Sequence, residues 1–397
     1  MASHYLVHNA VFSTGERMPV ILHRYTLAPA TLPNWYLLAR RRDTRSASTL
    51  LRDASVLRWL YEWAAERRLD LDDRVRLGTL TADEITALSR YLRLRRNSSV
   101  VGAIYGPDPS YADEPVEILS NKTLGDYLGV TRDFLIWAVA TFAPANVQDA
   151  DVRAHILEGQ DRIARAFGSV PRTSPARRGR GLTDNELEEL LDVVRPDSDR
   201  NPFRPSNRLR NQLILWCLLL FGMRRGELLK LTIDDLPLGP EETVLIANAT
   251  DDPDDPRRRE PRQKTLRRAV YCDRWLAVEL HAYATRRRGK TKYLFTNNRG
   301  SPIDYGGIHA IFVSLGRALP GLKATGRLHP HALRHTSAEL FRRFGRQSKY
   351  GEREVDEAMR NQFGWSARSE MPAHYGQSEI DAARQEILMA FQQRFRG

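Results

Sequence analysis

The stretch LILWCLLLFGMRRGELLKL, residues 213–231, joins a long apolar run to a pair of arginines. The run predicts a buried helix, Gly222 predicts a break, and the next helix carries Arg224, Arg225 and Glu227 in its first turn. An arginine on a buried scaffold is costly unless an anion pairs with it. The residues alone leave two explanations open: Arg224 forms a structural bridge with Glu227, or it binds an anionic ligand.

A second segment, HPHALRHTSAEL at residues 329–340, places an imidazole beside a guanidinium. Pro330 marks a helix start, and His331 and Arg334 are three residues apart, so they share a helix face. That pair suits a phosphate whose bond is being broken. The spacing of His331 and His335 also occurs in zinc proteases, but the glutamate of that motif is missing and Arg334 would repel a cation. Ordinary packing is the further alternative.

A third segment lies near the C-terminus, where Tyr375 follows Phe363-Gly364-Trp365. Taken singly, a tyrosine at such a place is more often a packing residue than a nucleophile. The order and separation of all the segments are better evidence of function than any single residue. Gly-Met-Arg-x-Gly-Glu-Leu, His-x-Leu-Arg-His, Phe-Gly-Trp and the tyrosine together resemble the tyrosine recombinase family of phage integrases and chromosome-dimer resolving enzymes.

The resemblance covers residues 183–397 closely and residues 31–168 more loosely. It implies a mainly α fold with a small β-sheet, in which an N-terminal helical core-binding bundle precedes an α-rich tyrosine recombinase catalytic domain. The family's catalytic lysine lies on a hairpin turn, and Lys264 is the only lysine in the charged stretch 251–268. The catalytic residues implied in this chain are Arg224, Lys264, His331, Arg334, Trp365 and Tyr375, with Glu227 and His335 in support.

These assignments imply a reaction in which Tyr375 attacks a DNA phosphodiester and forms a 3′-phosphotyrosyl bond. Arg224 and Arg334 would hold the non-bridging oxygens, His331 would serve as base or electrostatic partner, and Lys264 would protonate the leaving 5′ oxygen. Trp365 stands where most members have histidine, and its indole can donate a hydrogen bond but cannot shuttle a proton. With neither a phosphate-binding loop nor an acidic cluster in the sequence, we expect no ATP, metal or other cofactor.

The charge composition favours a polyanion or an anionic surface as partner and does not choose between them. Lys and Arg total 61 against 49 Asp and Glu, a formal net charge of +12. No run approaches the ~20 apolar residues of a membrane span, and no signal peptide is evident, so we expect a cytoplasmic, nucleoid-associated protein. The only cysteines are Cys217 and Cys272, and we expect both to be buried and reduced.

Local patterns predict four regions. Residues 1–30 form an arm or hairpin, and residues 31–168 a helical DNA-binding domain that includes a helix from Ser48. Residues 169–182 are a basic linker, and residues 183–397 a catalytic domain that ends in a helix over 378–397. Capping boxes are predicted at Thr81/Glu84 and Thr183/Glu186, and strands at 243–249, 267–272 and 292–295. The linker arginines expected near DNA are Arg172, Arg177, Arg178 and Arg180.

The sequence therefore predicts a site-specific recombinase or integrase of a mobile genetic element, acting on double-stranded DNA. From the family we expect a dimer on each site, a tetrameric synapse, and accessory DNA-bending proteins as possible partners. Two alternatives stay open. One is a related breaking and rejoining enzyme, such as a topoisomerase-like protein or a telomere resolvase. The other is a catalytically silent DNA-binding regulator with the same fold.

Overall fold

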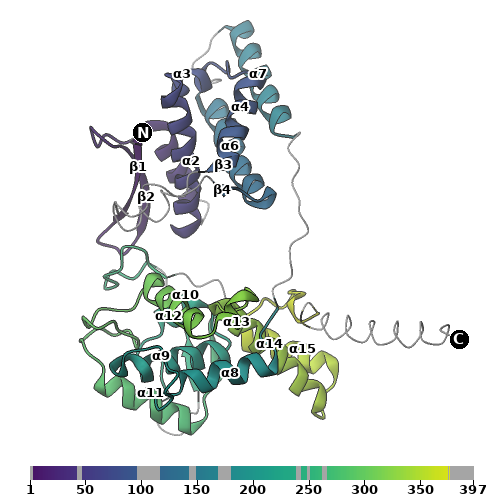
Figure 1. Cartoon of the computed structure of the whole chain (residues 1–397). Coiled ribbons are helices and arrows are strands. Elements are labelled where there is room, and N and C mark those ends of the chain that lie inside the picture. The colour runs from purple at the N-terminus through teal and green to yellow at the C-terminus, as the bar shows by residue number, and fades with distance from the viewer. Residues whose placement is uncertain are drawn as a thin grey trace, which may run out of the picture. The chain divides into compact units, whose positions relative to one another are not determined.

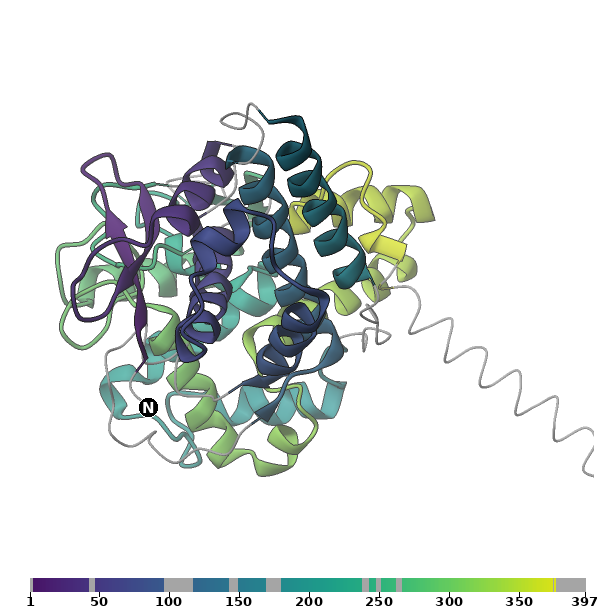
Figure 2. The same ribbon diagram turned by 90° about the horizontal axis from the view of Figure 1, so that it is seen from above.

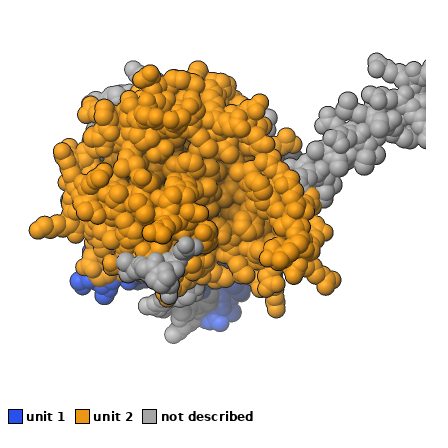
Figure 3. All heavy atoms as spheres, turned by 90° about the horizontal axis from the view of Figure 1, so that it is seen from below, with its two compact units in different colours: residues 1–176 blue, residues 177–397 orange. Residues whose placement is uncertain are grey.

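A computed structural model of the chain describes residues 3–42, 47–95, 117–142, 149–168, 180–237, 243–247, 251–261, 266–373 and 375. The chain divides into two compact units, residues 1–176 and residues 177–397, which Figure 3 colours separately. Among the described residues, no helix is long and apolar enough to cross a membrane.

The first unit packs helices against an N-terminal hairpin. Strands β1 (Tyr5–Val11) and β2 (Arg17–His23) pair antiparallel and lie beside α2 (Figures 1 and 2). A short ladder joins β3 (Leu94–Arg95) to β4 (Glu117–Ile118). The helices are α1 (Thr31–Arg42), α2 (Ala47–Glu66), α3 (Leu71–Arg76), α4 (Ala82–Arg93), α6 (Asn121–Phe142) and α7 (Ala150–Gly168).

The hairpin is attached to α2 by one buried carboxylate. Glu62 accepts hydrogen bonds from the backbone N–H groups of His4 at 2.9 Å and Tyr5 at 2.7 Å. Trp63, on the other side of the same turn, is buried in the core of the unit. The capping box at Thr81 and Glu84 is confirmed, because each residue's side chain receives the other's backbone N–H.

The second unit is again mainly helical, with one small sheet made by β5 (Thr243–Ile246) and β6 (Arg268–Tyr271). Its helices are α8 (Asp184–Val194), α9 (Pro205–Leu220), α10 (Arg225–Lys230), α11 (Arg274–Arg286), α12 (Tyr305–Ala318), α13 (Pro320–Ala324), α14 (Pro330–Gln347) and α15 (Glu352–Phe363). The predicted mainly α fold with a small sheet is confirmed. Its apolar core gathers around α9, the helix predicted from the 213–231 stretch.

The strand predicted at 292–295 is wrong. This segment makes a single bridge, between Tyr293 and Thr232. Two backbone hydrogen bonds flank the bridge: Leu294 donates to the carbonyl of Leu231 at 2.8 Å, and Ile233 donates to that of Lys292 at 3.0 Å. The partner segment cannot continue a ladder because the carboxylate of Asp235 accepts the N–H and hydroxyl of Thr232 and turns the chain.

The start of the second unit is fixed on α14. The predicted capping box of Thr183 and Glu186 opens α8. Just before it, the backbone N–H of Gly181 donates to Glu339 at 3.1 Å, and that of Leu182 donates to the hydroxyl of Thr336 at 2.8 Å. A residue with a side chain at position 181 would meet the backbone of Thr336, so the segment can lie this close only as glycine.

Gly222 lies in the predicted break between two helices, α9 and α10. Its φ of +59° is in the left-handed region, and a Cβ at this position would lie 2.3 Å from a ring carbon of Phe363. Its carbonyl accepts a hydrogen bond from Arg334 at 2.5 Å. The chain reversal after α9 therefore brings α10, α14 and the end of α15 together.

We predict that Gly222→Ala lowers the free energy of unfolding by more than the backbone cost alone. A non-glycine residue in the left-handed region costs about 1–2 kcal/mol, and overpacking against Phe363 adds about 1–3 kcal/mol. Gly326→Ala is the matched control, because Gly326 also has a positive φ but a Cβ there meets nothing within 4 Å. Urea titrations of both variants test this. Equal losses in the two would contradict the close approach to Phe363.

Candidate active site

The first predicted arginine begins α10. The backbone N–H of Arg224 donates to Glu227 at 2.9 Å, and its Nη1 lies 3.7 Å from the same carboxylate. The structural bridge considered from the sequence is therefore present, although the side chains meet only as an ion pair. Burial lowers the pKa of Arg224, partly offset by the charge of Glu227, and the side chain keeps 28 % of its surface exposed.

Glu227 is surrounded by more positive charge than it can neutralise. Its side chain is fully buried, and besides Arg224 it faces Arg268, whose Nη2 donates to it at 2.9 Å, and Arg334, whose Nη1 lies 3.9 Å away. One carboxylate against three guanidiniums leaves a formal charge of +2. Such a surplus in a largely buried place favours binding of an anion.

Arg268 was not predicted from the sequence. It lies on β6, where Arg268 and Val270 are buried while Ala269 and Tyr271 are exposed. The two-residue period of the strand therefore points the arginine inward with the valine. Its Nε also donates to the carbonyl of Gln362 at 2.8 Å, which links β6 to the end of α15. Alternation along the strand was the signal that could have singled it out.

Arg334 occupies the centre of the group. It is 1 % exposed, and it donates to the carbonyls of Gly222 at 2.5 Å and Phe363 at 2.7 Å. Its guanidinium lies 5.8 Å from the ring centre of Trp365. Burial, and then the nearby charge of Arg224, lower the pKa of Arg334 to about 9, so the group remains charged at neutral pH.

Tyr375 packs against Trp365 and His335, beside the arginines. Its ring stacks on Trp365, with ring centres 5.5 Å apart and planes 11° apart. Its hydroxyl lies 2.9 Å from Nδ1 of His335. Burial raises the pKa of Tyr375 to about 12, while the charges of Arg334 and Arg224 act in the opposite direction. The phenol is therefore protonated at neutral pH and needs an acceptor for its proton before it can act as a nucleophile.

His331 lies one turn before His335 on α14. The two imidazoles meet edge to face with ring centres 4.3 Å apart, and His331 is exposed while His335 is buried. Burial of part of its ring, and then the charges of Arg334 and Arg224, lower the pKa of His331 to about 4. It is therefore neutral at pH 7. The sequence predicts that His331 acts as base or electrostatic partner of the tyrosine, whereas the imidazole within hydrogen-bond distance of the phenol is that of His335.

Two buried donors of the site have no hydrogen-bond acceptor within the described part of the chain. They are Nη1 of Arg224 and the indole Nε1 of Trp365. Buried donors are normally satisfied, and an unsatisfied one costs about 1–3 kcal/mol. An oxyanion placed against the guanidiniums could accept hydrogen bonds from both donors. Cleavage of a phosphodiester requires such donors, because negative charge on the phosphate oxygens must be stabilised.

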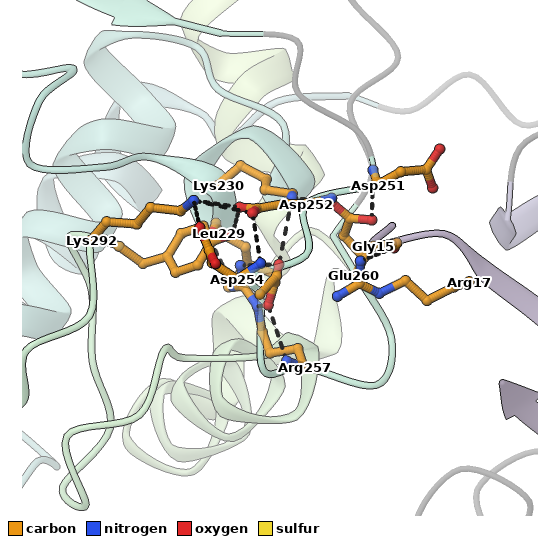
Figure 4. A network of polar contacts seen from close by, with 12 residues as sticks. Gly15, Arg17, Leu229, Lys230, Asp251, Asp252, Asp254, Arg257, Glu260 and Lys292 are labelled. Atoms are coloured by element: carbon orange, nitrogen blue, oxygen red, sulfur yellow. Dashed lines mark hydrogen bonds and ion pairs between the residues drawn. The ribbon is translucent and has the colours of Figure 1, made fainter. Parts of the chain in front are cut away.

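The loop between β5 and β6 is fixed to the end of α10 by buried ion pairs (Figure 4). Lys230, the last residue of α10, pairs with Asp255 at 3.5 Å and with Glu260. Arg257 pairs with Asp255 at 2.8 Å, and its Nη1 donates to two backbone carbonyls. Glu260 also accepts backbone N–H groups at the start of the loop. The described part of this charged stretch is thus anchored to the helix that begins next to Arg224.

Several predicted residues lie outside the described residues: Lys264, Arg172, Arg177 and Arg178. The predicted C-terminal helix 378–397 does so as well. Arg180 is described and is exposed. Within the described ranges, no group of three or more His, Cys, Asp or Glu side chains could hold a metal ion.

Sequence comparison with known proteins found a matching family model and curated relatives. The model of the phage integrase family matches residues 180–345. A tyrosine recombinase XerC of Bacillus pumilus is 32% identical over 162 residues, 40% of this chain and 46% of the relative. A tyrosine recombinase XerA of Thermococcus kodakarensis is 28% identical over 169 residues, 43% of this chain and 49% of the relative. The aligned part spans about half the length of these relatives.

The fold is similar to that of the XerH site-specific recombinase, solved bound to its difH substrate in a pre-cleavage complex. The TM-score is 0.52 at 17% identity, over 89% of this chain and 84% of that chain. The family-model match over residues 180–345 and the curated relatives, which are tyrosine recombinases, confirm the resemblance noted in the motifs.

We predict that His331 makes the protein less stable as pH falls from about 6.5 to about 4. In this window the unfolded chain binds a proton at His331 that the folded chain, with its lowered pKa, does not bind. Stability contributed by the neutral ring is therefore present above pH 6.5 and lost toward pH 4. His331→Gln should show a smaller decline in the free energy of unfolding across this range, measured by urea titration. His309→Gln, at an exposed position of α12, is the control. A decline as steep as that of the wild type would contradict the lowered pKa.

Proposed function

We propose that this protein is a site-specific DNA recombinase that cleaves and rejoins strands through a covalent 3′-phosphotyrosyl intermediate. The observation that carries the proposal is that the buried Tyr375 lies within electrostatic reach of Arg224 and Arg334, in a group of arginines whose charge exceeds that of Glu227. The match of residues 180–345 to the phage integrase family model supports the same reaction.

In the proposed reaction, Arg224 and Arg334 hold the non-bridging oxygens of the scissile phosphate, and the indole N–H of Trp365 donates to one of them. The oxygen of Tyr375 attacks phosphorus, the bond to the 5′ oxygen breaks, and the 5′ oxygen takes a proton from Lys264. The phosphodiester is conserved in the tyrosyl ester, so a 5′-hydroxyl from another strand can reverse the step. The chemistry then needs neither ATP nor a metal.

The rest of the predicted organisation belongs to the same proposal. The helical region 31–168 would bind DNA together with the catalytic region, and the linker arginines would contact phosphates, as the net charge of +12 favours. We propose a dimer on each recombination site and a tetramer in the synapse, with the 378–397 helix contacting a neighbouring protomer. Accessory DNA-bending proteins would be further partners.

We predict that Tyr375→Phe abolishes covalent capture of nicked suicide DNA that contains the native site, while DNA binding is unchanged. The variant keeps the ring that stacks on Trp365 and loses only the nucleophilic oxygen. Denaturing gels measure the adduct, and gel shifts measure binding. Tyr350→Phe, at a 58 % exposed tyrosine, is the matched control and should behave as the wild type.

An adduct that persists in Tyr375→Phe would overturn the assignment of the nucleophile. A wild-type protein that binds the site but never forms an adduct would instead indicate a silent DNA-binding regulator. Relaxation of supercoiled DNA without exchange between two sites would indicate a topoisomerase-like relative.

We predict that Trp365→Phe slows cleavage roughly 10- to 100-fold, the size of one hydrogen bond to a charged group. The substitution keeps an aromatic ring against Tyr375 and removes only the indole donor, which is unsatisfied within the described part of the chain. Trp365→His should recover activity, because histidine supplies a donor. Single-turnover cleavage rates measure both. A Phe variant as fast as the wild type would show that the indole donates nothing to the phosphate.

A further inference from the structure

The imidazole of His335 lies within hydrogen-bond distance of the proposed nucleophile, Tyr375. Its Nδ1 lies 2.9 Å from the hydroxyl of Tyr375, and both side chains are buried, at 6 % and 4 % exposed. The neighbouring His331 has the exposed position. The contact joins residues 40 positions apart in sequence, so it depends on how the chain after α15 packs on α14.

We propose that His335, and not His331, is the catalytic residue that receives the phenolic proton of Tyr375 during DNA cleavage. This assignment rests on the proposed function and specifies its first proton transfer. For Nδ1 to accept, the imidazole is neutral and carries its proton on Nε2. The distance of 2.9 Å is within the range required of a general base.

The step balances with groups already named. As the bond from the Tyr375 oxygen to phosphorus forms, the O–H bond breaks and the proton moves to Nδ1 of His335. The bond from phosphorus to the 5′ oxygen breaks, and that oxygen takes a separate proton from Lys264. In rejoining, the imidazolium of His335 returns its proton to the tyrosine oxygen as that oxygen leaves phosphorus.

Packing also suits His335 for holding the phenol in place. Trp365 stacks on the ring of Tyr375 while His335 holds its oxygen, so both the plane and the tip of the side chain are fixed. Holding the phenol and accepting its proton are different duties, and the experiment must separate them. His335→Asn does so, because an asparagine oxygen can accept the hydrogen bond but cannot take the proton.

The test measures single-turnover cleavage of nicked suicide DNA by wild type, His335→Asn, His331→Asn and the control His309→Asn. We expect His335→Asn to lose roughly 10²- to 10⁴-fold in cleavage rate, the usual contribution of a general base, with DNA binding unchanged. Replacing Tyr375 by difluorotyrosine makes the phenol more acidic, and the loss caused by His335→Asn should then shrink at least about tenfold. A 5′-bridging phosphorothiolate, whose sulfur leaves without a proton, should not rescue His335→Asn.

Each other outcome overturns the assignment. A loss of the same size with difluorotyrosine would leave His335 a structural role only, and rescue by the phosphorothiolate would make it the acid for the leaving group. If His331→Asn loses more cleavage rate than His335→Asn, and difluorotyrosine reduces that loss, His331 would be the general base. If His335→Asn does not fold, nitrogen NMR of the wild type decides, since a proton on Nδ1 of His335 would contradict its role as acceptor. Absence of an adduct in the wild type overturns the proposed function itself, and this assignment with it.

Discussion

The arrangement of the catalytic unit depends on the carboxylate of Glu227. It is fully buried and faces guanidiniums from α10, β6 and α14, three elements that are far apart in the sequence. A buried carboxylate without partners would be strongly unfavourable, so its burial requires these arginines to come near. The arginines in turn repel one another, and one carboxylate does not neutralise them. Glu227 thus assembles the site and leaves it positively charged.

Burial strengthens the electrostatic interactions of the arginines around Glu227. In water the arginines would be screened, whereas around Arg334 the medium is largely protein and the interactions are stronger. The same burial raises the pKa of Tyr375 and lowers that of His331. Tyr375, the proposed nucleophile, is therefore kept protonated, and the exposed His331 is kept neutral. In the proposed function, the scissile phosphate would offset the surplus positive charge and accept from Arg224 and Trp365, whose buried donors have no hydrogen-bond acceptor among the described residues.

Local features of the fold could be predicted from the sequence because they depend on neighbouring residues. The capping boxes of Thr81 and Thr183 depend on residues three positions away, and the break at Gly222 follows from the lack of a side chain. The strand expected at 292–295 failed because a strand needs a partner, and the turn at Thr232 ends that partner after one bridge. The domain functions assigned to residues 31–168 and to the linker remain predictions.

The sequence by itself determined which chemical groups are present and their order, because the family resemblance depends on spaced motifs such as Arg224, His331 to Arg334 and Tyr375. Only the tertiary structure decided which groups meet. Arg268 joins Glu227 across 41 residues, and His335 meets Tyr375 across 40. Helix periodicity relates residues within a few turns and says nothing of contacts at such separations. Those contacts follow from the packing of α10, β6, α14 and the chain after α15 around one buried charge.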